Sequence, residues 1–295
     1  MKIVKPRTSQ QFKLALGGIV FSVVTNDGLG LTVPPSHKAF LVSEGEPDIT
    51  LRAEFGTVPS LEMEEVFRTR GLWGLYRSKD KWVLHFCAWE LETTPYKVAI
   101  MEPDFRAGTI CSRSKESRQN NCFNPLNYPL DELLTINFLS RGRGMLVHAC
   151  AVEYRGQGWL FLGASGAGKT TLSGLWEGEP GVTLLSDDRI IIRETGDGYR
   201  IYGTPWHGSV EIASPSSAPL SRIFFLVHDH ENRLTRIQGA DVASRLLVRS
   251  FPTFWDGEGM SYTLDLCERL STRVPCYELG FLPDKRVISM LKNLV

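Results

Sequence analysis

The chain has 295 residues, of which 42% are hydrophobic and 22% are charged, as in ordinary globular proteins that bury a sizeable core. Its 33 basic residues cancel its 33 acidic residues, so no net charge directs the protein to nucleic acid or to an anionic membrane. No run of about 18 apolar residues occurs, and the sequence therefore predicts no transmembrane helix and a cytoplasmic protein.

The first half of the chain is rich in short β-type segments. Runs of β-branched and aromatic residues lie between turn-forming residues, which is typical of strands. These predicted strands are residues 19–24, 39–42, 49–53, 81–86 and 98–101. Residues 113–126 are polar without periodicity and are expected to form a loop. Residues 130–139 have apolar side chains at helical spacing and predict a helix that leads into the second half.

From Gly144 onward, strands and helices alternate. Residues 145–152, 159–162 and 182–185 read as strands, with a helix over residues 170–176 between the last two. This order predicts a parallel or mixed sheet. Further strands are expected at residues 189–193, 199–202, 223–227 and 234–237, the last two as a hairpin, followed by a helix at residues 240–249.

A phosphate-binding motif follows the strand at residues 159–162. The segment reads GASGAGKT and matches G-x-x-x-x-G-K-[ST] at every defined position. Glycines let the backbone wrap closely around phosphates, while successive N–H groups and the next helix N-terminus attract negative charge. The candidate nucleotide-binding residues are Gly163, Ala164, Ser165, Gly166, Ala167, Gly168, Lys169, Thr170 and Thr171.

Within this motif, two side chains have distinct expected tasks. Lys169 is expected to reach the β- and γ-phosphates of ATP, and the Thr170 hydroxyl is expected to bind Mg²⁺. The alternative, a chance match, is disfavoured because an apolar strand precedes the motif and a helix follows it.

An acidic pair, Asp187 and Asp188, ends the next strand. A triphosphate site needs a carboxylate for the metal ion and a group that accepts the proton of the attacking hydroxyl. Two adjacent carboxylates suit these two tasks, whereas a paired Asp without the motif would only cap a turn. His148, on the strand before the motif, is either a core histidine or a neighbour of this pair.

Three other segments carry weaker signals. The turn-rich segment GTPWHG at residues 203–208, with Glu211 after it, could present substrate or supply a metal ligand, or could be a solvated loop. The triplet at residues 228–230 (HDH) is expected at a hairpin end rather than at a zinc site. Arg245 and Arg249 share a predicted helix face that is expected to be solvated, although they could contact phosphate. The six cysteines form no CxxC pair and are expected to be buried thiols in a reducing compartment.

Together, His148, GASGAGKT, SDD at residues 186–188 and the Glu211–Ile212 pair resemble the catalytic domain of the HPr kinase/phosphorylase family. The resemblance extends over residues 144–230 and implies the P-loop fold shared with phosphoenolpyruvate carboxykinase. It is closest to kinases that accompany the biosynthesis of modified peptides. We therefore expect a mixed α/β (α+β) fold, with a β-rich N-terminal domain at residues 1–140, a candidate for substrate recognition, and a P-loop domain at residues 141–295.

The resemblance also implies roles and partners. Asp188 is the expected base, with His148 near it, and Asp187, Thr170 and Glu211 are the expected Mg²⁺ ligands, although the two aspartates could exchange or share roles. The implied activity is an ATP- and Mg²⁺-dependent kinase acting on a serine-type hydroxyl of a peptide, a protein or a small molecule. A homo-oligomer is compatible with this expectation.

Differences from the family leave other readings open. Lys169 is followed by Thr170 and Thr171, where the family has Ser followed by Glu, and the segment after Ile212 lacks the family's glycine- and arginine-containing signature. HPr as the substrate and phosphorylase activity are therefore not expected. The alternatives are carboxykinase-type chemistry, for which the chain is short, and a nucleotide-gated binding module without phosphoryl transfer.

Overall fold

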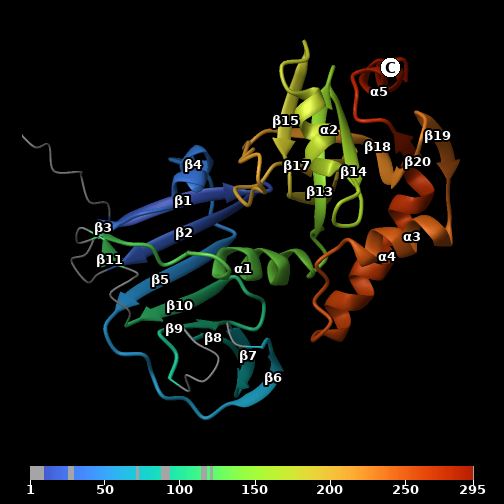
Figure 1. Ribbon diagram of the computed structural model, residues 1–295. Coiled ribbons are helices and arrows are strands. Elements are labelled where there is room, and N and C mark those ends of the chain that lie inside the picture. The colour runs from blue at the N-terminus through green and yellow to red at the C-terminus, as the bar shows by residue number, and fades with distance from the viewer. Residues whose placement is uncertain are drawn as a thin grey trace, which may run out of the picture. The chain divides into compact units, whose positions relative to one another are not determined.

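The computed structural model describes residues 10–25, 30–70, 73–87, 94–113, 118–119 and 122–294. The chain divides into two compact units, Met1–Ala15 with Ile19–Phe138, and Leu16–Gly18 with Leu139–Val295. The fold is mixed α/β, with two large sheets and few helices (Figure 1). In the described part of the chain, no helix has both the length and the apolar character needed to cross a membrane.

The first unit contains a nine-stranded mixed sheet in the order β4-β1-β2-β5-β10-β9-β8-β7-β6. β5 pairs in parallel with both β2 and β10, and the pairs from β10 through β6 are antiparallel. The strands are β1 Gln11–Leu16, β2 Ile19–Thr25, β4 Leu41–Val42, β5 Ile49–Phe55, β6 Glu64–Arg68, β7 Trp73–Ser78, β8 Lys81–Phe86, β9 Lys97–Met101 and β10 Ala107–Ser112.

Smaller elements complete this unit. β3 Gly30–Leu31, β11 Arg118–Gln119 and β12 Cys122–Phe123 form a three-stranded sheet, so the expected loop at residues 113–126 includes two short strands. Helix α1 spans Leu130–Leu139 as predicted. The strand predicted at residues 39–42 is confirmed only for β4, Leu41–Val42, because residues 39 and 40 belong to a 3₁₀ helix, Pro35–Phe40. Consecutive prolines, Pro34 and Pro35, set the backbone for this turn, and the His37 N–H donates to the Pro34 carbonyl at 3.0 Å.

The second unit is built around an eight-stranded sheet. Its strands run in the order β14-β13-β16-β17-β18-β20-β19, β15 also pairs with β13, and β14 pairs with β18. The parallel pairs β14–β18 and β18–β20 occur beside antiparallel pairs, which confirms the mixed sheet. The strands are β13 Met145–Tyr154, β14 Gln157–Leu162, β15 Val182–Ser186, β16 Arg189–Thr195, β17 Gly198–Tyr202, β18 Ser217–His228, β19 Arg233–Ile237 and β20 Cys276–Phe281.

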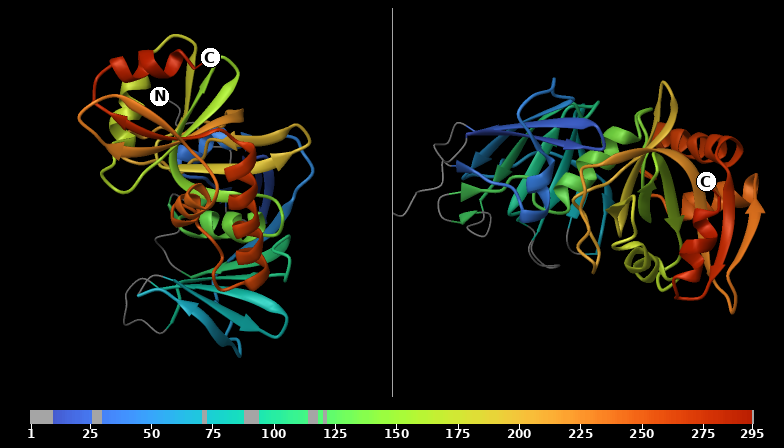
Figure 2. Two further views of the ribbon diagram at one scale, coloured as in Figure 1. Left: turned by 90° about the vertical axis from the view of Figure 1, so that its right-hand side faces the viewer. Right: turned by 90° about the horizontal axis from the view of Figure 1, so that it is seen from above.

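Helices cover both faces of this sheet (Figure 2). Because successive side chains of a strand point to opposite faces, Val147 and Ala149 of β13 pack with α3 and α4, whereas Cys150 and Val152 pack with α2 and α5. The helices are α2 Lys169–Trp176, α3 Ala240–Val248, α4 Gly257–Arg273 and α5 Arg286–Lys292. Strand β14 is buried between these layers from Gly158 to Leu162, and its Trp159 is fully buried.

Two expectations for the second unit are wrong. The strands β18 and β19 do not form a hairpin, because β20 lies between them and pairs with both. The chain reaches that central position only after α3 and α4, and such a long-range insertion leaves no local signal. Helix α3 ends at Val248, so Arg249 lies beyond the helix rather than on a shared face with Arg245.

The buried cysteines agree with the expectation of thiols in the interior. Cys111, Cys150, Cys267 and Cys276 are buried, and Cys87 is half-buried. Burial raises the pKa of Cys150 to about 11 and that of Cys267 to about 12, which keeps both thiols protonated at neutral pH. The side chain of Cys122 lies outside the described residues.

Candidate functional site

Strand β13 aligns the glycine-rich segment with the acidic pair. On one side of β13, Ala149 lies opposite Leu162, the last residue of β14. On the other side, the Ala149 N–H donates to the Asp188 carbonyl at 3.1 Å. Neighbouring strands are about 5 Å apart, so the end of β14 and Asp188 lie at the same level, roughly 10 Å from each other.

The acidic pair occupies a break in one edge of the sheet. β15 and β16 both pair with β13, β15 with its second half and β16 with its first half. Asp187 and Asp188 are the two residues between these strands, and the Ser186 hydroxyl accepts hydrogen bonds from the N–H groups of Asp188 and Arg189 at 3.3 Å. The break turns both carboxylates out of the regular strand pattern.

Residues 163–168, here called the glycine loop, connect β14 to α2. Gly166 and Gly168 have φ values of 81° and 98°, which only glycine adopts readily. A Cβ on Gly163 would lie 2.7 Å from the Ala167 Cβ, and one on Gly168 would lie 2.7 Å from the Phe281 ring. The loop can therefore close tightly only with glycine at these positions.

Lys169 is buried beneath the glycine loop. Its Nζ donates to the carbonyls of Gly163 at 2.9 Å and Ala164 at 3.2 Å. Burial lowers the pKa of Lys169, and the negative charge of Asp188 acts in the opposite direction. No side chain caps α2, and Lys169, Thr170 and Thr171 of its first turn line a common cavity, where uncapped N–H groups would attract negative charge.

Asp187 is buried and fastens a loop. Its Oδ1 accepts the Gly208 N–H at 2.9 Å and its Oδ2 accepts the Val210 N–H at 3.0 Å. A Cβ on Gly208 would lie 2.8 Å from Oδ2, so glycine is needed for this close approach. The segment at residues 203–216 is therefore attached to the acidic pair and is not only a solvated loop: Thr204 and Trp206 are buried, whereas His207 is exposed.

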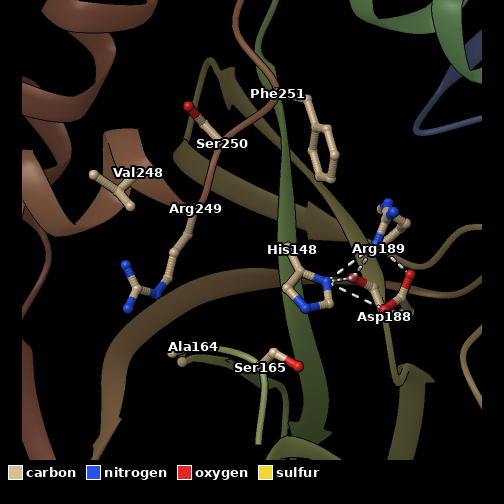
Figure 3. A pocket seen from close by; sticks show the side chains of 10 residues that line it. His148, Ala164, Ser165, Asp188, Arg189, Val248, Arg249, Ser250 and Phe251 are labelled. Carbon is tan, nitrogen blue, oxygen red and sulfur yellow. Dashed lines mark hydrogen bonds and ion pairs between the residues drawn. The ribbon is translucent and has the colours of Figure 1, made fainter. Parts of the chain in front are cut away.

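Asp188 forms a polar cluster with His148 and Arg189. His148 Nδ1 lies 3.1 Å from the Asp188 Oδ1, and Arg189 Nη1 contacts both the Asp188 carboxylate and His148 Nδ1 (Figure 3). His148 and Arg189 are directly opposed on β13 and β16, which places their side chains on one face.

The charge state of Asp188 follows from this cluster. Burial acts to raise its pKa, but the hydrogen bond with His148 and the positive charges of Arg189 and Lys169 outweigh it, and the pKa is lowered. The carboxylate is thus ionised at neutral pH. Three quarters of the side chain is buried and the rest faces a cavity.

Two adjoining cavities open at this cluster. The first, here called the loop cavity, has a volume of about 320 Å³. The second, here called the arginine cavity, has a volume of about 470 Å³. His148, Ser165 and Asp188 line both. Thr170, Lys169 and Asp187 line only the loop cavity, whereas Arg249 and Phe251 line only the arginine cavity.

The structure thus brings most of the predicted residues to one place. His148, Asp187 and Asp188 border the loop cavity, together with Ser165, Gly166, Gly168, Lys169, Thr170 and Thr171. Gly163 and Ala164 line the arginine cavity. Ala167 is buried beneath the loop. Glu211 is exposed, has a φ of 57° and is not among the residues that line either cavity.

Other sequence candidates lie elsewhere. Arg245 is paired with Asp241 and Glu278 at 3.0 and 2.8 Å. The triplet at residues 228–230 begins at the end of β18, where Asp229 accepts hydrogen bonds from the His230 N–H and Arg233.

The sequence did not predict the roles of three residues at this site. Arg189 neutralises Asp188, Gly208 approaches Asp187, and Phe251 lies under the Arg189 guanidinium at 4.5 Å from the ring centroid. Only Arg189 had a local signal, since it directly follows the acidic pair.

The loop cavity is lined by oxygen-bearing side chains of the kind that bind Mg²⁺. Mg²⁺ in nucleotide sites binds one or two carboxylates together with phosphate oxygens, and the Thr170 hydroxyl and the two aspartates border one cavity. Among the described residues, no three His, Cys, Asp or Glu side chains are grouped to hold a metal ion. The Thr170 hydroxyl and the two carboxylates would fit a metal ion whose remaining ligands are phosphate oxygens.

Comparison with protein-family models and with curated proteins found no match. The resemblance to the HPr kinase/phosphorylase family thus remains a prediction based on the motifs.

Proposed function

We propose that the second unit is an ATP- and Mg²⁺-dependent kinase that phosphorylates a serine-type hydroxyl on a peptide, a protein or a small molecule. One observation carries the proposal: Lys169, the first turn of α2 and an ionised carboxylate, Asp188, border a single cavity. Donors for phosphates and an acceptor for a hydroxyl proton are the two components that phosphoryl transfer needs. The HPr kinase-like P-loop fold remains part of this proposal.

The glycine loop and Lys169 would bind the phosphates. Lys169 Nζ now donates to two carbonyls of the loop and would exchange these for phosphate oxygens, which are stronger acceptors for an ammonium group. Thr170 and Asp187 would hold Mg²⁺, which when bound neutralises charge on the β- and γ-phosphates.

Asp188 would orient the attacking hydroxyl. The bond from the hydroxyl oxygen to the γ-phosphorus forms, the bond from that phosphorus to the bridging oxygen of ADP breaks, and the proton passes to the Asp188 carboxylate. Because its pKa is lowered, Asp188 accepts the proton late, when the hydroxyl has become acidic through bonding to phosphorus. His148 and Arg189 fix the direction of the carboxylate.

The alternative function is a nucleotide-gated binding module. The observation in its favour is the pair of hydrogen bonds that the Asp187 carboxylate accepts from the N–H groups of Gly208 and Val210, which connects the loop cavity to the segment around Trp206. In this alternative, nucleotide binding changes the segment at residues 203–216 and a partner reads that change, with no phosphoryl transfer.

The test uses the full chain with γ-labelled ATP, Mg²⁺ and a panel of serine peptides and small hydroxyl compounds, followed by mass spectrometry. A gain of one phosphoryl group on a hydroxyl supports the kinase. Lys169→Ala should weaken ATP binding by about tenfold or more, since it removes a charged donor. Lys285→Ala is the control, because Lys285 is 69% exposed and paired with Glu179.

The outcomes separate the two functions. Unchanged ATP affinity in a folded Lys169→Ala protein contradicts the phosphate-binding role of the loop. Tight, Lys169-dependent ATP binding with neither transfer nor hydrolysis across the panel favours the binding module.

A further inference from the structure

The arginine cavity is lined by the guanidinium group of Arg249, which is incompletely hydrogen-bonded within the described part of the chain. Arg249 lines this cavity, and its Nε is buried with no hydrogen-bond partner among the described residues. The two other arginines nearby differ from it, since Arg189 is paired with Asp188 and Arg245 is paired with Asp241 and Glu278. Arg249 as a whole is half-buried, so the rest of its guanidinium can face the cavity, and an anion bound there would offset its charge.

The backbone holds Arg249 firmly beside the acidic cluster. The Arg249 carbonyl accepts the His148 N–H at 2.7 Å, and the Phe251 N–H donates to the Leu146 carbonyl at 2.9 Å. A β-bridge between Val147 and Ser250 lies between these two hydrogen bonds. Residues 249–251 are thus attached to β13, the strand that carries His148, so the positions of Arg249 and Asp188 are linked through one rigid element.

The cavity connects Arg249 with the proposed reaction site. Figure 3 shows Arg249 and the His148–Asp188 pair at different places around the cavity, with Ala164 and Ser165 of the glycine loop between them in this view. Val248 and Phe251 add apolar surface. A molecule in this cavity can therefore place a hydroxyl near Asp188 while another group reaches Arg249.

We propose that the arginine cavity is the acceptor site and that the acceptor carries a carboxylate that pairs with Arg249. A planar guanidinium binds carboxylates through two parallel hydrogen bonds, which fixes the orientation of the bound molecule as well as its affinity. The substrate class is then a hydroxyl compound that also carries a carboxylate, with both groups inside one cavity. The assignment as an acceptor site rests on the proposed kinase function, but anion binding at Arg249 can be measured independently of it.

The experiment measures binding by isothermal titration to the full chain, with and without Mg²⁺ and a non-hydrolysable ATP analogue. The probes are matched pairs that differ by one charge: glycerate and glyceramide, N-acetylserine and N-acetylserinamide, and the capped dipeptides Ser-Asp and Ser-Asn. The variants are Arg249→Gln and, as a matched control on the same segment of chain, Arg245→Gln.

We expect at least one carboxylate probe to bind about tenfold more tightly than its amide, which is the effect of one charge-assisted contact. Arg249→Gln should remove this difference, whereas Arg245→Gln should keep it, and neither should alter affinity for the ATP analogue more than about twofold.

Two results would overturn the inference. One is equal or absent binding of both members in every pair. The other is a loss of ATP-analogue affinity in Arg249→Gln comparable with that in Lys169→Ala, which would make Arg249 a nucleotide ligand. Failure of the kinase proposal would give a different result, namely that ATP does not bind or that its binding does not depend on Lys169. Carboxylate binding measured without nucleotide tests Arg249 alone.

Discussion

At the scale of single residues, the adjacent aspartates Asp187 and Asp188 have different environments. Asp187 is 3% exposed and accepts two backbone N–H groups, whereas Asp188 faces both cavities and pairs with two cationic or polar side chains. Of the two carboxylates, only that of Asp188 borders the arginine cavity, so the proposed base is the one next to the proposed acceptor site.

Asp188→Asn is the sharpest test of the base. The amide keeps the shape and can still accept a hydrogen bond from Arg189, but it cannot take a proton. We expect ATP binding to be retained and phosphoryl transfer to fall by about 10² or more. Asp229→Asn, in the turn after β18, is the control. A fully active Asp188→Asn protein would rule out the base.

The pH dependence gives an independent view of the same carboxylate. A lowered pKa means that Asp188 is ionised at all pH values well above its ordinary range near 4. Its protonation should therefore produce no acid limb in kcat/KM between about pH 5 and 8. An acid limb in that range that disappears in Asp188→Asn would show that its pKa is raised instead.

At the scale of elements, the site depends on how the segment at residues 203–216 is fastened. Gly203 lies so close to β15 that a Cβ there would contact the Leu185 carbonyl at 2.4 Å, and Gly208 lies against Asp187. Both glycines can come this close because they have no side chain of their own. The segment is thus positioned by two glycines, and its sequence, rich in turn residues, does not reveal that these glycines are needed for close packing.

Gly208→Ala should misplace Asp187 or the segment around it. The added methyl would lie 2.8 Å from the Asp187 Oδ2, so one of the two must move. We expect phosphoryl transfer to fall by about tenfold or more, because small displacements of positioned groups are costly. Transfer and thermal unfolding are measured together.

The matched control is Gly174→Ala in helix α2, where no heavy atom lies within 4 Å of the added Cβ. Alanine is a better helix former than glycine, so this variant should keep activity and be equally or more stable. Equal activity of Gly208→Ala and the wild type would show that the contact is unimportant.

At the scale of the whole molecule, each of the two compact units buries its own ionisable side chains. The first unit contains Lys97, which is 1% exposed and donates from Nζ to the Pro125 carbonyl at 3.1 Å. Burial lowers the pKa of Lys97 to about 7, although the charge of Asp131 opposes this. A second buried polar contact, between His37 and Asp131 at 2.7 Å, lies in the same unit.

Lys97 should make the stability of the protein depend on pH. In the unfolded chain its pKa is near 10.4, so between about pH 7 and 10 the unfolded state binds more protons than the folded state. The contribution of Lys97 to the free energy of unfolding therefore rises as pH rises through this window, by at most about 1.4 kcal/mol per pH unit.

Lys97→Met should flatten this rise, and it should be as stable as the wild type or more stable at pH 7, since a buried ammonium is costly. Chemical denaturation at pH 7, 8 and 9 measures the effect, with Lys13→Met as the control, because the Lys13 Nζ donates to the Gly45 carbonyl in a solvent-exposed contact. The same pH slope in Lys97→Met and the wild type would contradict the lowered pKa.

The sequence by itself determined the local features of this protein. Helix α1, strand β8 and the strand–loop–helix order around Lys169 follow from apolar periodicity and from glycines, which act over a few neighbouring residues. The candidacy of Lys169, Asp187 and Asp188 came from the same short-range patterns, since residue types at fixed spacing carry that information.

Only the tertiary structure decided which distant residues meet. Arg249 lies a hundred residues from His148, yet it reaches the arginine cavity because residues 249–251 pair with β13. Likewise, β20 separates β18 from β19, and Asp187 accepts the N–H of Gly208. Such pairings depend on backbone hydrogen bonds and shape, which are common to most residue types and therefore leave little trace in a single sequence.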